Sequence, residues 1–68
     1  MSSYIVGINN GETAANFPKT VCASLEAAEL QYAEYLANAL ANEYVYISEI
    51  QLNAPPRIIK SDYGPNEV

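Results

Sequence analysis

Histidine and tryptophan are absent from this chain, and cysteine occurs once, as Cys22. Without histidine, the chain lacks the commonest general base and metal ligand of proteins, together with every serine–histidine or cysteine–histidine catalytic pair. A single cysteine also excludes an internal disulfide and a structural zinc site built on several thiolates. We therefore expect neither a metal site nor an enzyme active site, and a lone thiol fits a reducing cytosol.

Basic residues are scarce as well, because three lysine and arginine side chains stand against eight carboxylates, giving a net charge of −5 at pH 7. Nucleic-acid phosphates and anionic membranes repel such a chain, so we expect direct contact with neither. Its natural complement is a protein partner with a basic surface. Apolar runs long enough to cross a bilayer and an N-terminal leader are lacking, which predicts a soluble protein in the cytoplasm of its host cell.

The three glycines are too scattered to form a dinucleotide-binding fingerprint or a phosphate-binding loop, and we expect no cofactor. Two weaker candidates for chemistry remain. Glu26 and Glu29 could form a carboxylate pair, although solvent-facing carboxylates that interact with a helix dipole explain them better. Cys22 could be a reactive thiol near a helix N-terminus, but a lone cysteine in a strand is more often a small buried hydrophobe.

Helix-forming residues fill the stretch from Ser24 to Asn42, which is rich in alanine, leucine, glutamate and glutamine and contains no glycine or proline. Ser24 is suited to cap its N-terminus. We predict that this stretch is the only helix. Its apolar residues recur at helical spacing and form one stripe, which we expect to be buried: Leu25, Ala28, Tyr32, Leu36, Ala39 and Leu40.

Four other segments have the character of strands. Ser3–Ile8 alternates between two faces, Lys19–Ala23 and Tyr44–Leu52 are rich in β-branched or aromatic residues, and Arg57–Lys60 adds a short edge strand. Asn9-Asn10-Gly11 is predicted to form the first turn. The faces of the third segment are not cleanly sorted, so either it is buried on both faces at its start or a bulge shifts its register.

At 68 residues the chain is expected to form one domain, 1–68, with a loose tail over 61–68. The element order is β-β-α-β-β. We therefore predict an α+β fold, a small antiparallel sheet of three to four strands with one helix packed on one face. The order of the strands within the sheet stays open, because the third strand can lie beside either earlier one.

Six tyrosines are more than so small a core needs, and tyrosine is enriched at protein interfaces. Tyr32 and Tyr46 are expected in the core, Tyr35 lies at the margin of the helix stripe, and Tyr4, Tyr44 and Tyr63 stand near ends where a ring can be half exposed. Of these, we expect Tyr35 or Tyr44 to anchor a partner. Leu30 falls away from the helix stripe and is either an ordinary exposed leucine or part of a contact surface. The predicted partner-binding residues combine these with carboxylates that supply an acidic surface: Glu26, Glu29, Leu30, Glu34, Tyr35, Glu43, Tyr44, Glu49 and Asp62.

This small acidic chain carries its elements in the segments YIVGINNG, KTVCASLEAAELQYAEYL and YVYISEIQL. In architecture and charge it resembles the small inhibitor proteins of bacteriophages and mobile elements, in particular anti-CRISPR proteins. The resemblance implies an inhibitor that binds a CRISPR effector, commonly a type I surveillance complex, and blocks target DNA access or nuclease recruitment. An acidic protein does so as a DNA mimic when its carboxylates lie where phosphates would lie in a basic channel.

Two other classes stay open. A homodimeric accessory or structural phage protein, joined through its edge strand or Leu30, would account for the apolar fraction of the chain and would need no host partner. An acidic antidote to a basic toxin would account for the charge, and it would require a small basic protein as its partner.

Overall fold

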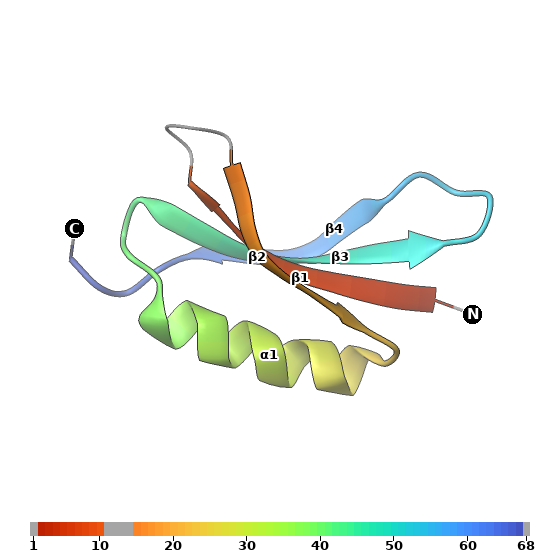
Figure 1. The fold of residues 1–68 in the computed structure, drawn as a ribbon, viewed down its shortest axis with the longest axis horizontal. Coiled ribbons are helices and arrows are strands. Elements are labelled where there is room, and N and C mark those ends of the chain that lie inside the picture. The colour runs from red at the N-terminus through yellow and green to blue at the C-terminus, as the bar shows by residue number, and fades with distance from the viewer. Residues whose placement is uncertain (1, 11–14, 68) are drawn as a thin grey trace.

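The computed structural model describes residues 2–10 and 15–67, with the side chains of residues 10 and 15–19 outside the description. The described chain forms one helix and one four-stranded sheet (Figure 1). The predicted α+β class and the β-β-α-β-β order of elements are confirmed. In chain order the elements are β1 (Ser2–Asn10), β2 (Ala15–Cys22), α1 (Leu25–Asn38), β3 (Glu43–Gln51) and β4 (Arg57–Tyr63).

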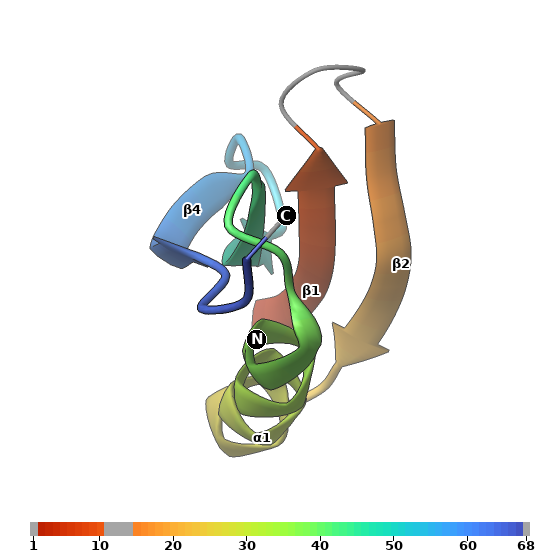
Figure 2. The ribbon, with the colours of Figure 1, turned by 90° about the vertical axis from the view of Figure 1, so that its left-hand side faces the viewer.

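The strands lie in the order β2-β1-β3-β4, and every neighbouring pair is antiparallel. β1 is therefore a central strand, paired with β2 on one side and with β3 on the other. This arrangement answers the question that the sequence leaves open, since α1 carries the chain past β1 before β3 begins. Figure 2 shows β2 and β4 at opposite edges, with α1 lying along one side of the sheet.

Three strands are longer than the sequence predicts. β1 runs to Asn10, so the predicted Asn9-Asn10-Gly11 turn is wrong for its first two residues, while its third lies outside the described residues. β2 begins at Ala15, four residues before the predicted start of the second strand at Lys19. Pairing with neighbouring strands explains both extensions, because Asn10 lies opposite Ala15 on one side and Glu43 on the other.

The helix is shorter than predicted and ends at Asn38 rather than Asn42. Ser24 caps its N-terminus as expected, because its Oγ accepts a hydrogen bond from the Ala27 N–H at 3.2 Å. At the other end Ala39 is extended, with φ −80° and ψ 147°, so the chain leaves the helix there. Helix propensity continues beyond this point, and a tertiary contact overrides it.

That contact comes from the C-terminal segment. It corrects the prediction of a loose tail over 61–68 for the described part of that segment, while residue 68 lies outside the described residues. β4 continues to Tyr63. Beyond it, the Asn66 Nδ2 group donates to the Ala37 and Ala39 carbonyls at 3.0 and 2.9 Å. The last carbonyls of an α-helix have no partner within the helix, so a distant side chain satisfies them here.

Gly64 lets the two backbone segments lie against each other. A Cβ atom at this position would overlap the backbone of Ala39 and Leu40, so a larger residue would push the segments apart. The Gly64 N–H also donates to the Glu43 carbonyl at 2.9 Å, which extends the ladder between β4 and β3. The end of α1, the start of β3 and the end of β4 are thus joined at one corner of the molecule.

The core lies between α1 and one face of the sheet. Ala28 and Tyr32 come from α1, Val6 from β1, and Val45 and Ile47 from β3, and each is at most 3% exposed. Tyr32 is thus a core residue, as predicted. These side chains follow the helical and strand periods expected of a two-layer fold.

Other core predictions are confirmed in part. Cys22 is buried, as expected of a small hydrophobe, and Leu36 packs partly buried against the core. Leu25 and Leu40 of the predicted stripe are instead 41% and 39% exposed. Leu40 lies beyond the end of the helix, and Leu25 occupies its first position.

β3 is buried on both faces over four consecutive residues, which is one of the two arrangements that the sequence allows. Its pairing with β1 is in unbroken register. The bulge lies in β4. Ile47 of β3 pairs with Lys60 and the next residue, Ser48, pairs with Ile58, so Ile59 of β4 is the extra residue.

Candidate interaction surface

The sheet has a second face, turned away from α1, and no described element packs over it (Figures 1 and 2). Successive residues of a strand point to opposite faces, so the strands that fill the core also place alternate side chains on this second face. We call its apolar and aromatic residues on three strands the open face: Ile5 of β1, Tyr44, Tyr46 and Ile50 of β3, and Ile58 and Tyr63 of β4. Val21 of β2, which pairs with Ile5, adds an exposed apolar side chain on the same side of the sheet.

Tyr46 lies at the centre of the open face and is 9% exposed, although no second layer covers it. Its ring lies against Gly7, the residue opposite in β1, where an added Cβ would lie 2.8 Å from the Tyr46 hydroxyl oxygen. Burial, and secondly the neighbouring Tyr44, raise the pKa of Tyr46. The prediction that Tyr46 is buried is confirmed, on the face away from the helix.

The tyrosines of the open face contact one another. The ring centroid of Tyr44 lies 6.2 Å from that of Tyr46 and 5.8 Å from that of Tyr63, and the second pair is edge-to-face. Toward the β4 edge exposure rises, with Tyr63 68% and Ile58 56% exposed. Large aromatic and aliphatic side chains presented in this way are typical anchors of protein interfaces.

A hollow of about 440 Å³ lies in the open face. Because none of its lining residues is charged, the hollow suits an apolar or aromatic group of a partner. A second hollow, of about 350 Å³, shares Tyr44 and Ile58 with the first and adds Asp62 at the β4 edge. The first hollow is lined by Ile5, Asn9, Tyr44, Tyr46, Ser48, Ile50, Pro56 and Ile58.

Three predicted residues, Glu26, Leu30 and Glu34, lie on the outer side of α1 at successive i, i+4 positions. All three are exposed, and Leu30 is 70% exposed. Neither carboxylate forms an ion pair with a side chain in the described part of the molecule. The structure therefore brings together one exposed leucine and two carboxylates on a surface remote from the open face.

Two other predicted carboxylates form ion pairs within the molecule. Glu29 Oε1 lies 3.7 Å from Lys60 Nζ, and Glu49 Oε1 lies 2.8 Å from Arg57 Nη2. The pair of Lys60 and Glu29 is about half exposed on both sides, and such a pair adds little to stability, whereas the side chain of Glu49 in the second pair is largely buried. Arg57 and Lys60 are the two basic residues whose side chains the structure describes, and each is already paired with a carboxylate.

Asp62 has an internal partner as well. Its Oδ2 atom accepts a hydrogen bond from the Tyr32 hydroxyl at 2.8 Å, and Lys60 Nζ lies 4.9 Å from the centroid of the same ring. Burial first, and then the hydrogen bond and charge of Asp62, raise the pKa of Tyr32 above its ordinary value of 10.0. These contacts tie α1 to the edge strand β4.

The remaining predicted residues are Glu43, Tyr35 and Tyr44. Glu43 accepts a hydrogen bond from the Leu40 N–H at 2.9 Å, in the turn that follows α1. Tyr35 packs against the core, and its hydroxyl forms a hydrogen bond with the hydroxyl of Thr20. Tyr44 alone lies on the open face, so the two predicted anchors are on opposite sides of the sheet and one flat partner does not reach both.

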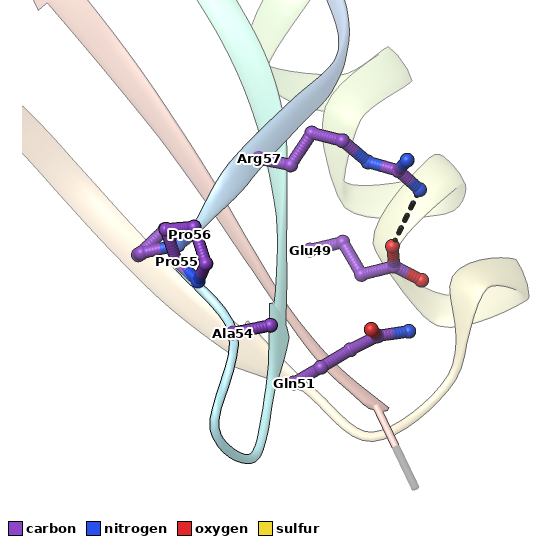
Figure 3. A pocket seen from close by; sticks show the side chains of 6 residues that line it. All are labelled: Glu49, Gln51, Ala54, Pro55, Pro56 and Arg57. Atoms are coloured by element: carbon purple, nitrogen blue, oxygen red, sulfur yellow. Dashed lines mark hydrogen bonds and ion pairs between the residues drawn. The ribbon is translucent and has the colours of Figure 1, made fainter.

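Figure 3 shows a third hollow, of about 370 Å³, at the hairpin between β3 and β4. Arg57 and Glu49 point toward each other there, while Pro55 and Pro56 point away from this ion pair. Asn53 in the turn has φ 64°, a left-handed conformation that asparagine tolerates. This hollow follows from the shape of the hairpin. Its polar side chains do not converge on one point as they would in a binding site for a small molecule.

Five residues of the open face are missing from the predicted set: Ile5, Tyr46, Ile50, Ile58 and Tyr63. They come from three strands, and only the order β2-β1-β3-β4 makes them neighbours. One signal was present in the sequence, because the third strand segment carries apolar residues on both faces and a single helix covers only one.

Within residues 2–10 and 15–67, no three histidine, cysteine, aspartate or glutamate side chains gather in a way that could hold a metal ion. In the same ranges no helix is long and apolar enough to cross a membrane. Comparison with protein-family models, with curated proteins and with solved structures finds no match to this chain. What the protein does must therefore be inferred from its own surfaces.

Proposed function

We propose that this chain is a non-enzymatic binding protein whose open face docks on a protein partner. The observation that carries the proposal is an uncovered sheet face with an uncharged hollow of about 440 Å³ beside the exposed side chains of Ile58 and Tyr63. Contiguous apolar and aromatic surface on a small protein marks an interaction site more often than a solvated face. An apolar side chain of the partner fills the hollow, and the tyrosines surround it.

The charge of the chain favours a partner that is basic around the contact. The net charge is −5, and Arg57 and Lys60 are already paired with carboxylates. Glu26 and Glu34 on α1 are exposed to solvent. Attraction between this acidic surface and a basic one accelerates association, and it weakens as the salt concentration rises.

Within this class we favour an inhibitor of the anti-CRISPR type that acts in the cytoplasm of the host cell. Its small size and acidity support this choice. The partner is then a CRISPR effector, with a type I surveillance complex as the first candidate. Because α1 and the open face lie on opposite sides of the sheet (Figures 1 and 2), the chain sits between two surfaces of the partner: the open face contacts protein on one side of the DNA-binding channel, and the carboxylates of α1 face lysines and arginines on the other side as a DNA mimic. Target DNA is thereby blocked from the channel.

The test is a binding titration against a purified type I surveillance complex. Ile58→Glu places a charge in the uncharged hollow and should raise the dissociation constant at least about 30-fold, as loss of an interface anchor does. Leu52→Glu is the matched control, because Leu52 is 88% exposed in the hairpin and lies outside the open face. Equal binding by the Ile58→Glu variant and the wild-type chain would exclude the open face as the docking site.

The acidic contribution is measured in the same titration. The double substitution Glu26→Lys and Glu34→Lys should slow association and flatten its dependence on salt. Glu67→Lys makes the same kind of charge change in the C-terminal segment and serves as the control. If the wild-type chain binds no CRISPR effector complex, the anti-CRISPR assignment is wrong.

A further inference from the structure

We infer that two copies of this chain pair through the outer edge of β4 in one defined register, forming a continuous sheet of twice four strands. β4 is the last strand of the sheet, and all seven of its residues are exposed. α1 packs mainly over β1, β2 and β3 and reaches β4 through the side chains of Lys60 and Asp62, while every residue of β4 stays exposed. An edge strand of this kind presents backbone groups that another strand can bind.

The backbone ladder determines which residues of β4 face outward. The Gly64 N–H donates to the carbonyl of Glu43, the residue opposite. Hydrogen-bonded and non-hydrogen-bonded pairs alternate along an antiparallel ladder. Asp62 and Lys60, two and four residues earlier, therefore turn their backbone groups toward β3. Ser61, between them, turns its N–H and C=O toward the outer edge.

A symmetric pair of antiparallel strands must place outward-facing residues opposite each other. With the two-fold axis at Ser61, the two Ser61 residues exchange N–H to C=O hydrogen bonds. In this register Lys60 of each copy lies directly opposite Asp62 of the other. The sequence Lys60-Ser61-Asp62 is thus self-complementary in charge, and the pair of oppositely charged neighbours occurs twice in the dimer.

Charge also excludes the neighbouring registers. An axis at Lys60 would set the two ammonium groups opposite each other, and an axis at Asp62 would do the same with the two carboxylates. Like charges in directly opposite positions are destabilising. The bulge at Ile59 on one side and Pro65, which has no N–H, on the other confine regular pairing to the short stretch between them.

Both charged side chains can make the new contact while keeping their present ones. Asp62 uses Oδ2 to accept from Tyr32, so Oδ1 can accept from Lys60 of the second copy. Lys60 lies 3.7 Å from Glu29, and both side chains of that ion pair are about half exposed. In the dimer the two open faces lie on the same side of the joint sheet, so the inference extends the proposed function without depending on it.

The test is sedimentation equilibrium of the full chain from about 10 µM to about 1 mM, because an edge contact buries less surface than a standard interface and binds weakly. Lys60→Asp places carboxylates opposite Asp62 and should raise the dimer dissociation constant about tenfold. Asp62→Lys should do the same with ammonium groups. Combining both substitutions exchanges the charges and should restore the wild-type constant to within about threefold. Glu34→Lys is the charge-reversal control on α1.

Ser61→Pro provides a test that changes no charge. It removes the outward N–H, which β3 does not use, and proline is tolerated at such edge positions. Dimerisation should disappear, while the thermal unfolding midpoint of the monomer stays within a few degrees of the wild-type value. In the wild-type chain, the Ser61 amide should gain protection from hydrogen exchange only at concentrations where the dimer forms.

Three results would overturn the inference. They are a wild-type chain that is monomeric throughout the concentration range, a dimer that survives Ser61→Pro, and a charge-exchanged double variant that dimerises no better than the single variants. Docking of the open face is assessed separately with Ile58→Glu, whose side chain lies outside the paired stretch. The two proposals therefore fail in distinguishable ways.

Discussion

Gly7 allows a sheet without a second layer to bury an aromatic ring. The ring of Tyr46 occupies the space that a side chain at position 7 would take, and this makes Tyr46 one of the buried residues of the molecule. Contact between an aromatic ring and a glycine on the neighbouring strand compensates for the side chain that the glycine lacks. The centre of the open face is therefore packed, while its β4 edge is exposed.

Gly7→Ala is expected to destabilise the protein by about 1–3 kcal/mol, because the added methyl group overlaps the Tyr46 ring and forces it from its position. Urea unfolding followed by circular dichroism gives the free energy of unfolding. Ser3→Ala, in the same strand and exposed, is the control and should change this free energy by less than about 0.5 kcal/mol. Alanine has the better strand propensity, so a more stable Gly7→Ala variant would show that the ring moves aside freely.

The end of α1 is determined by a tertiary contact. Residues after Asn38 keep the composition of a helix, yet Ala39 is extended and Asn66 accounts for the carbonyls left behind. Only the folded chain brings residue 66 to this place, so helix propensity predicts the start of the helix, at its serine cap, better than its end.

Asn66→Ala should lower the free energy of unfolding by about 1–2 kcal/mol, because the Ala37 carbonyl loses its side-chain donor and the Ala39 carbonyl keeps only the Asn66 backbone N–H, at 3.3 Å. Asn38→Ala is a matched control, since the Asn38 side chain makes a single exposed hydrogen bond to the Glu34 carbonyl. That control should cost less than about 0.5 kcal/mol. Equal losses in the two variants, measured by chemical denaturation, would argue against a capping role for Asn66.

At the scale of the whole molecule, the sequence predicts the class of fold but not the arrangement of its sheet. Helical and strand periods are local properties, so one helix and its neighbouring strands are recognisable from residue patterns. Strand order depends on pairing between distant segments, and the open face exists only in that order. Tyr44 is accordingly in the predicted site, whereas Ile58 and Tyr63 become recognisable only once β4 is placed beside β3.

Tyr32 and Tyr46, which lie on opposite faces of the sheet, should make the whole fold less stable at alkaline pH. Burial is the first cause of the raised pKa of Tyr32 and of Tyr46, so ionising either hydroxyl costs more in the folded state than in the unfolded state. Their contribution is fully present below pH 10 and is lost as the pH rises above it. Tyr32→Phe should lower stability at neutral pH and reduce the loss above pH 10.

Urea unfolding midpoints at about pH 8 and about pH 11 provide the measurement. The urea midpoint of the wild-type chain should decrease from about pH 8 to about pH 11. The midpoint of the Tyr32→Phe variant should decrease by less. The remaining decrease comes from Tyr46 and from the other tyrosines. An identical decrease in both proteins would show that ionisation of the Tyr32 hydroxyl does not contribute to the alkaline loss of stability.

The tyrosine cluster of the open face also makes the protein its own optical reporter. Tyr44 lies within 6.2 Å of Tyr46 and 5.8 Å of Tyr63, a separation at which the transitions of neighbouring rings couple. The chain contains no tryptophan to mask their near-ultraviolet signal. A binding event on the open face should therefore change the near-ultraviolet circular dichroism of the unlabelled protein, whereas contact with the outer side of α1 should leave it unchanged.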